Sequence, residues 1–86
     1  MSIFRIIWDQ PDDPDGNVQH ILERGLEIED VEEVLASPTS EGRSESSGRS
    51  CVWGYTWEDV YVIVIYEEVD EDAIRVVTAY EVPEPR

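Results

Sequence analysis

The sequence predicts a single α+β domain, residues 1–86, in which two helices pack on one face of an antiparallel β-sheet. Three observations support this fold class. The apolar patterns follow the order β-α-α-β-β-β along the chain. The segment Val60–Tyr66 is an uncharged run of β-branched and aromatic residues. Short connections between the last three strand patterns favour antiparallel neighbours, and two amphipathic helices can cover only one face of such a sheet.

The run Val60–Tyr66 is the expected central strand. It is too short to span a membrane, and its β-branched residues disfavour a helix. Apolar residues occupy both alternating sets of positions, so both faces of this strand should be covered. Because the helices cover only one face of the sheet, the other face must be covered either by aromatic side chains of this chain or by a second chain.

The first half of the chain reads as one strand and two helices. A strand is expected at Ser2–Trp8, and a loop rich in proline and aspartate follows it. The first helix is predicted at Asn17–Arg24, with Asp15 or Asn17 as its N-terminal cap. Its predicted buried face carries Val18, Ile21 and Leu22. A second helix is predicted at Ile28–Ala36, with an acidic solvent face and with apolar residues at helical spacing: Ile28, Val31, Val34 and Leu35.

The second half reads as a sheet with polar connections. Residues 39–50 contain no large apolar side chain and are predicted to form a flexible polar loop or an exposed hairpin arm. The remaining assignments are strands at Cys51–Trp57, Val60–Tyr66 and Ala73–Glu81, an acidic turn at Glu67–Asp72, and an extended tail at residues 82–86.

The charge balance is strongly acidic. Twenty-one acidic residues face six basic ones, which gives a net charge of −15 at pH 7, and all six bases are arginine. This charge favours a basic partner and repels nucleic acid and acidic membranes at ordinary ionic strength. A salt-adapted surface is the alternative explanation, because the Debye length falls to about 3 Å in molar salt.

The numbers of cysteine and histidine residues limit the disulfides and metal sites that this chain can form. One cysteine, Cys51, excludes an intramolecular disulfide and is typical of a reducing cytoplasm. It lies in an apolar strand and is expected to be an inert, buried thiol. With a single histidine besides, the chain cannot build a cysteine-rich zinc site. The acidic loop at residues 11–17 lacks the ligand spacing of a calcium loop. No metal, cofactor or membrane association is expected.

Three motifs along the chain resemble small proteins of the BrnT-like and related families, which share the RelE/ParE toxin fold. The motifs are Trp8-Asp9, the stretch His20-x3-Arg24-Gly25 with its following V-x-x-V-L-x-x-P helix, and Ile74-Arg75-Val76-Val77-Thr78-Ala79. The resemblance covers nearly the whole chain. It implies an RNA-cleaving toxin that is paired with an antitoxin.

The chemistry that the resemblance implies is attack of a ribose 2′-hydroxyl on the adjacent phosphate. This reaction needs a base, cations and an acid. The implied catalytic residues are Arg75, His20 and Tyr80, and the implied phosphate-binding residues are Arg24 and Arg75. Tyr80 stands where BrnT-like proteins often carry a basic residue, and the tail lacks their basic C-terminal helix, so the active site is degenerate. RNA is a ligand only where the acidic charge is screened.

Each of these residues also has an ordinary structural interpretation. His20 can be a helix-surface residue, and the positive charge of Arg24 can interact favourably with the negative end of the dipole at the helix C-terminus. Arg75 inside an apolar strand needs either a carboxylate partner or a ligand. The aromatic residues Trp53, Tyr55 and Trp57 form either a core stripe, a partner surface or a base-stacking platform.

Two function hypotheses follow. The first is a toxin-family protein of a toxin–antitoxin system that binds a basic antitoxin-like protein. The second is a non-catalytic, acidic interaction module, paired with a basic protein or with a second copy as a homodimer.

Overall fold

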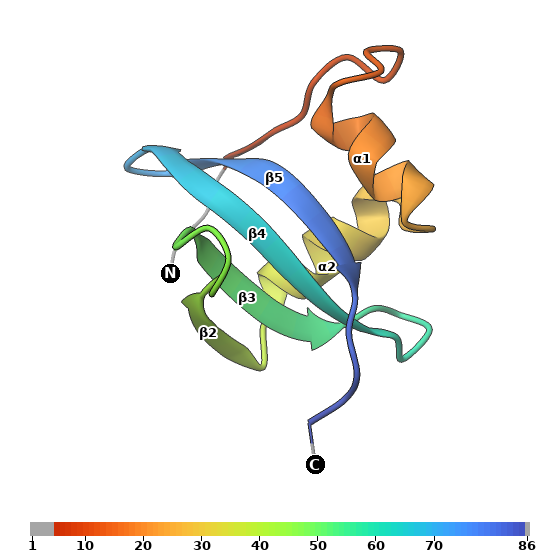
Figure 1. Ribbon diagram of the computed structural model, residues 1–86, viewed down its shortest axis with the longest axis vertical. Coiled ribbons are helices and arrows are strands. Elements are labelled where there is room, and N and C mark those ends of the chain that lie inside the picture. The colour runs from red at the N-terminus through yellow and green to blue at the C-terminus, as the bar shows by residue number, and fades with distance from the viewer. Residues whose placement is uncertain (1–4, 86) are drawn as a thin grey trace.

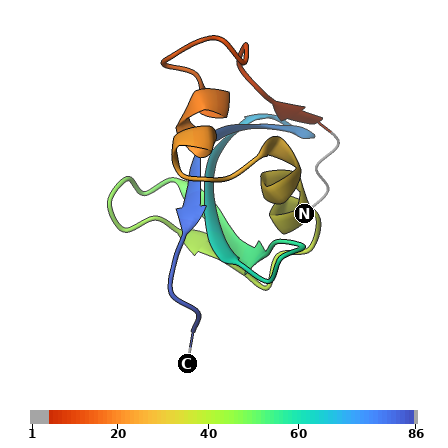
Figure 2. The same cartoon turned by 90° about the vertical axis from the view of Figure 1, so that its right-hand side faces the viewer.

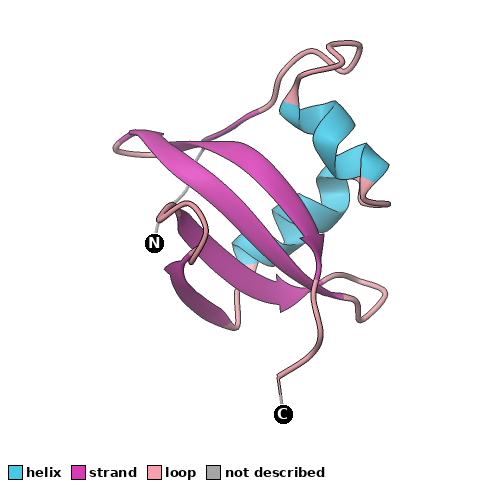
Figure 3. Cartoon of the chain, in the orientation of Figure 1, coloured by secondary structure: helices cyan, strands magenta, loops and turns pink. Residues whose placement is uncertain are grey.

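The computed structural model describes residues 5–85 and folds them into two helices and one five-stranded sheet (Figure 1, Figure 3). The elements in chain order are β1 (Arg5–Ile7), α1 (Asn17–Glu23), α2 (Ile28–Ala36), β2 (Ser40–Arg43), β3 (Ser50–Tyr55), β4 (Tyr61–Asp70) and β5 (Ala73–Glu81). The part of the predicted first strand at residues 2–4 lies outside the described residues. Neither described helix is long and apolar enough to cross a membrane.

The strand order in the sheet is β1-β5-β4-β3-β2. The strands β3, β4 and β5 are antiparallel neighbours, as predicted, and β2 is an additional strand that pairs antiparallel with β3. The prediction of a wholly antiparallel sheet is wrong, because β1 pairs with β5 in parallel, with Ile6 opposite Ile74. No hairpin joins these two strands, so neither turn geometry nor loop length in the sequence constrains their direction. The α+β class is confirmed with a mixed sheet.

The sheet curves around α2, and α1 lies beside β5 (Figure 2). The helix-side core is formed by side chains from both helices, from the connection between them and from three strands: Ile21, Leu26, Val31, Val34, Val52, Val62, Val64, Tyr66, Ile74, Val76 and Ala79. The predicted buried face of α1 is only partly right, because Leu22 is 47% exposed. The position of α2 and its apolar spacing agree with the prediction.

The opposite face of the sheet is closed by the chain itself. Cys51, Ile63 and Ile65 are buried there. The partly buried side chains that pack against them come from β3, β5 and the tail: Trp53, Val77, Tyr80 and Val82. The central strand therefore has both faces covered, as its sequence predicts, without a second chain.

Two connections differ from the prediction. The predicted acidic turn at Glu67–Asp72 is mostly strand, because β4 continues to Asp70 by pairing with β5 through two register shifts. The predicted polar loop at residues 39–50 contains β2, so the hairpin-arm alternative describes it. In both places cross-strand hydrogen bonds override the low strand propensity of polar residues.

The buried position of Cys51 makes its thiol unreactive. Its side chain is 1% exposed, and burial raises the pKa of the thiol. We expect a thiol reagent such as dithionitrobenzoate to label the folded protein near pH 8 far more slowly than the urea-unfolded protein. The raised pKa favours the folded state below the ordinary thiol pKa, and this contribution is lost as the pH rises through the folded-state value. Equal labelling rates in buffer and urea would contradict the prediction.

Candidate functional site

A buried polar network joins β1, α1 and β5. Asn17 is 1% exposed at the start of α1. Its side-chain amide donates to the carbonyls of Ile7 and Val76, at 3.0 and 2.8 Å. Its side-chain oxygen accepts the backbone N–H of Asp9 at 2.8 Å. One amide side chain therefore satisfies three backbone groups from two segments that are distant in sequence, residues 7–9 and β5.

Asp9 completes this network. Its carboxylate accepts the backbone N–H of Asn17 at 2.9 Å and a guanidinium N–H of Arg75 at 2.6 Å. The predicted cap at Asp15 or Asn17 is wrong, because the N-cap residue is Gly16 and it makes no side-chain cap bond. Asp9, eight residues before Asn17, caps the helix instead by accepting the Asn17 N–H. Gly16 lies close to Asp9, and a Cβ added to Gly16 would lie 2.8 Å from the Asp9 Cβ. The sequence between the two folds into a loop tight enough to require glycine there.

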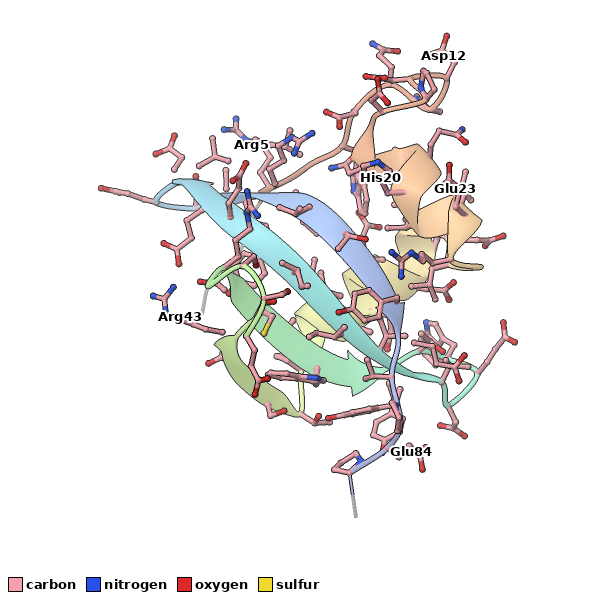
Figure 4. The ribbon with its side chains drawn as sticks, viewed as in Figure 1. Arg5, Asp12, His20, Glu23, Arg43 and Glu84 are labelled. Atoms are coloured by element: carbon pink, nitrogen blue, oxygen red, sulfur yellow. The ribbon has the colours of Figure 1, made fainter. Side chains whose placement is uncertain are left out.

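The open groove between α1 and β5 is the candidate site. It has a volume of about 300 Å³ and is lined by side chains of both elements: His20, Glu23, Arg24, Val77 and Thr78. Figure 4 shows His20 on the side of α1 that faces β5. Because β1 ends at Ile7, opposite Arg75, it does not extend along the part of β5 that borders this groove.

The structure brings three of the four implied nuclease residues together. The guanidinium of Arg24 lies over the ring of Tyr80, 5.0 Å from its centroid, beside His20 in the groove. A cation against an aromatic face holds the arginine in place. Arg75 lies on the same strand but is bound to Asp9 in an ion pair with partly exposed side chains. The groove thus offers an imidazole, a guanidinium and hydroxyl groups for proton exchange and anion binding.

The predicted aromatic surface divides into two parts. Trp53 is half-buried and packs over Gly42, where an added Cβ would lie 3.2 Å from the indole. Tyr55 and Trp57 are 37% and 81% exposed at the turn between β3 and β4. Burial, followed by the charge of Glu84, raises the pKa of Tyr55. Trp57 with Tyr55 is therefore the exposed aromatic surface.

Sequence reasoning missed several of these residues. Asp9 was noted only as part of the Trp8-Asp9 motif, and Asn17 only as a cap. The hydrogen bonds between Asp9 and Asn17 cross a loop, and the spacing of apolar residues gives no sign of them. Glu23 and Thr78 line the groove because of how α1 lies beside β5, which the sequence does not specify.

The family model described as "Domain of unknown function (DUF4258)" matches residues 17–81. The chain belongs to the DUF4258 family. The match includes the whole groove of this DUF4258 member, from α1 to β5, whereas Asp9 precedes it. Searches of curated proteins and of solved structures each returned no match.

Replacing Asn17 tests whether the network holds the fold together. We expect Asn17→Ala to lower the free energy of unfolding by roughly 2–4 kcal/mol, because buried groups of Ile7, Val76 and Asp9 lose their partner. Urea unfolding measures this. Gln19→Ala is the matched control: it removes a single exposed bond to Pro11, and a change within about 0.5 kcal/mol is expected. Equal changes in the two variants would contradict the structural role of Asn17.

Proposed function

We propose that this protein acts by binding a basic protein, as the acidic member of a toxin–antitoxin-type pair with a degenerate active site. The exposed aromatic surface is the observation that carries the proposal. Trp57 is 81% exposed in a turn that also carries Glu58 and Asp59. A large exposed aromatic side chain among carboxylates suits the apolar stems and cationic groups of lysine and arginine.

The charges support binding in preference to cleavage. The net charge of −15 attracts a basic protein and opposes the approach of RNA. Arg75, one implied phosphate ligand, holds the Asp9 carboxylate at 2.6 Å. Moving it onto a phosphate would remove the ion-pair partner of the carboxylate that binds the start of α1. Its role in this proposal is therefore structural.

The motifs that resemble BrnT-like proteins suggest the kind of partner. Those motifs, together with the α+β arrangement of two helices and one sheet, support the proposed likeness to RelE/BrnT-like proteins. Antitoxin-like proteins in such pairs are the expected basic partners. The likeness supplies the partner class, and the surface at Trp57 supplies the place of contact.

Substitution of Trp57 tests this proposal. We expect Trp57→Ser to weaken binding of a small basic protein encoded next to this chain by about tenfold or more, because exposed tryptophans at interfaces carry much of the binding energy. Isothermal titration calorimetry measures the affinity. Association of the unaltered protein should also slow as salt is added, because charge attraction steers the encounter.

Val69→Ser is the matched control for this experiment. Val69 is 54% exposed and lies at the other end of β4. We expect its affinity to stay within about twofold of the unaltered protein, as for substitutions outside the energetic centre of an interface. Failure of a basic neighbour to bind, or equal losses from the two variants, would contradict the proposal.

RNA cleavage in the α1–β5 groove is the second candidate function. It is favoured by one observation, which is that His20, Arg24 and Thr78 line the same open groove. A histidine exchanges protons near neutral pH, and an arginine binds phosphate oxygens. These are the groups that attack by a 2′-hydroxyl would need.

The groove hypothesis predicts cleavage of single-stranded RNA once salt screens the acidic charge. We expect His20→Ala to reduce such cleavage by about 10²–10⁴-fold, the usual contribution of a general acid or base. Gel analysis of a labelled RNA measures it, with Gln19→Ala on the same helix as the control. Absence of cleavage by the unaltered protein from low to molar salt would exclude this candidate and leave the binding proposal intact.

A further inference from the structure

The strand β2 is an uncovered edge of the sheet. It is the last strand in the order β1-β5-β4-β3-β2, and all four of its residues are exposed. Within the described part of the chain, β3 is its only strand neighbour. An edge strand presents unpaired backbone groups to any second strand of suitable sequence.

The hydrogen-bond pattern shows which groups of β2 face outward. The N–H of Ser44 donates to the Arg49 carbonyl at 2.8 Å. Since bonded and non-bonded pairs alternate in an antiparallel ladder, the Gly42–Cys51 pair is also bonded. The N–H of Thr56 donates to the Val60 carbonyl, so Thr56 is bonded toward β4. Alternation along β3 from this pair points the backbone N–H and carbonyl groups of Cys51 and Trp53 toward β2. The backbone groups of Glu41 and Arg43 therefore point away from β3.

Glu41 and Arg43, whose backbone groups face outward, carry opposite charges, so β2 of one copy is complementary to β2 of a second copy. We propose that two copies of this chain pair through β2, antiparallel and centred on Gly42. This register places Glu41 of each copy opposite Arg43 of the other, so that both opposed pairs are hydrogen-bonded and oppositely charged. Arg43 donates one bond to the Gly48 carbonyl of its own hairpin and keeps further N–H groups for a carboxylate. Figure 4 shows Arg43 projecting outward at this end of the sheet.

Gly42 suits the centre of this pairing. It has no side chain, and the indole of Trp53 lies directly over it. At the two-fold axis, the two glycines face each other as a non-bonded pair, about 4.5 Å apart. Each Trp53 then lies beside the junction on the same face of the joined sheet, which adds apolar contact to the backbone bonds.

Charge and size set the strength of this dimer. Two chains of net charge −15 repel each other over long range at low salt. In 0.1 M salt the Debye length is about 10 Å, so the repulsion between charges farther apart than this is largely screened. A four-residue strand pairing is small compared with the roughly 1,000 Å² of a stable interface. The dimer is therefore weak, and it forms at high protein concentration with moderate salt. This inference is independent of the proposed function, because it concerns a different edge of the molecule.

Charge reversal on β2 tests the pairing and its register. We expect sedimentation equilibrium to show a concentration-dependent dimer for the unaltered chain. Glu41→Arg alone, or Arg43→Glu alone, should weaken it about tenfold or more, because like charges then face each other twice. The double variant E41R/R43E should restore the dimer to within about threefold, since the opposed pairs again have opposite signs.

Glu71→Arg is the matched control. It makes the same change in net charge as Glu41→Arg, at an exposed position in the turn between β4 and β5, so an effect of the lowered total negative charge on dimerisation appears there as well. Circular dichroism of each variant confirms folding. A monomer at all concentrations and salts, or a dimer that tolerates either single reversal, would overturn the proposal.

Amide hydrogen exchange supplies a second measurement that needs no substitution. In the dimer, the amides of Glu41 and Arg43 become protected as the protein concentration rises, whereas the Gly42 amide is already bonded to β3 in the monomer. Exchange rates at Glu41 and Arg43 that do not depend on concentration would equally overturn it.

Discussion

The hydrogen bonds among Asp9, Asn17 and Arg75 are the constraint on which the arrangement of the other elements depends. They join the end of β1, the first residue of α1 and the middle of β5. Because a buried amide without partners is costly, these groups hold each other in one geometry. The parallel alignment of β1 with β5 and the position of α1 beside β5 both follow from that geometry. The groove containing His20 exists because α1 begins where Asp9 holds it.

The two faces of the sheet are closed by different means, and this determines where a partner can bind. The concave face is covered by α2, and the other face by side chains of the sheet and tail, including Trp53 and Tyr80. Neither face therefore needs a second chain. What is left for recognition is the periphery of the sheet: the edge strand β2, the turn at Trp57 and the groove beside β5. These three places differ in chemistry: a polar strand edge, an exposed aromatic turn and a groove lined by His20 and Arg24.

Local patterns in the sequence predicted the elements whose stability comes from local spacing. The bounds of α2 and β5 agree with the apolar periodicity, and both covered faces of Val60–Tyr66 follow from its composition. The failures involve partners that are distant in sequence. The ion pair of Arg75 spans 66 residues, and the direction of β1 depends on the same long-range contacts. His20, Arg24 and Tyr80 were grouped by a family resemblance, whereas periodicity alone does not place α1 against β5.

All six basic residues of this acidic chain are arginines, and several of them contact other groups of the chain. Four arginines are each committed to a group of this chain, namely the Tyr80 ring, the Gly48 carbonyl, Glu67 and Asp9. These contacts hold together β5, the β2–β3 hairpin and the start of α1, and six arginines against twenty-one acidic residues leave the net charge at −15. The long-range field is therefore set by acidic residues, and it favours ligands that bring positive charge. A phosphate chain entering the groove would meet Arg24 only after crossing this acidic field.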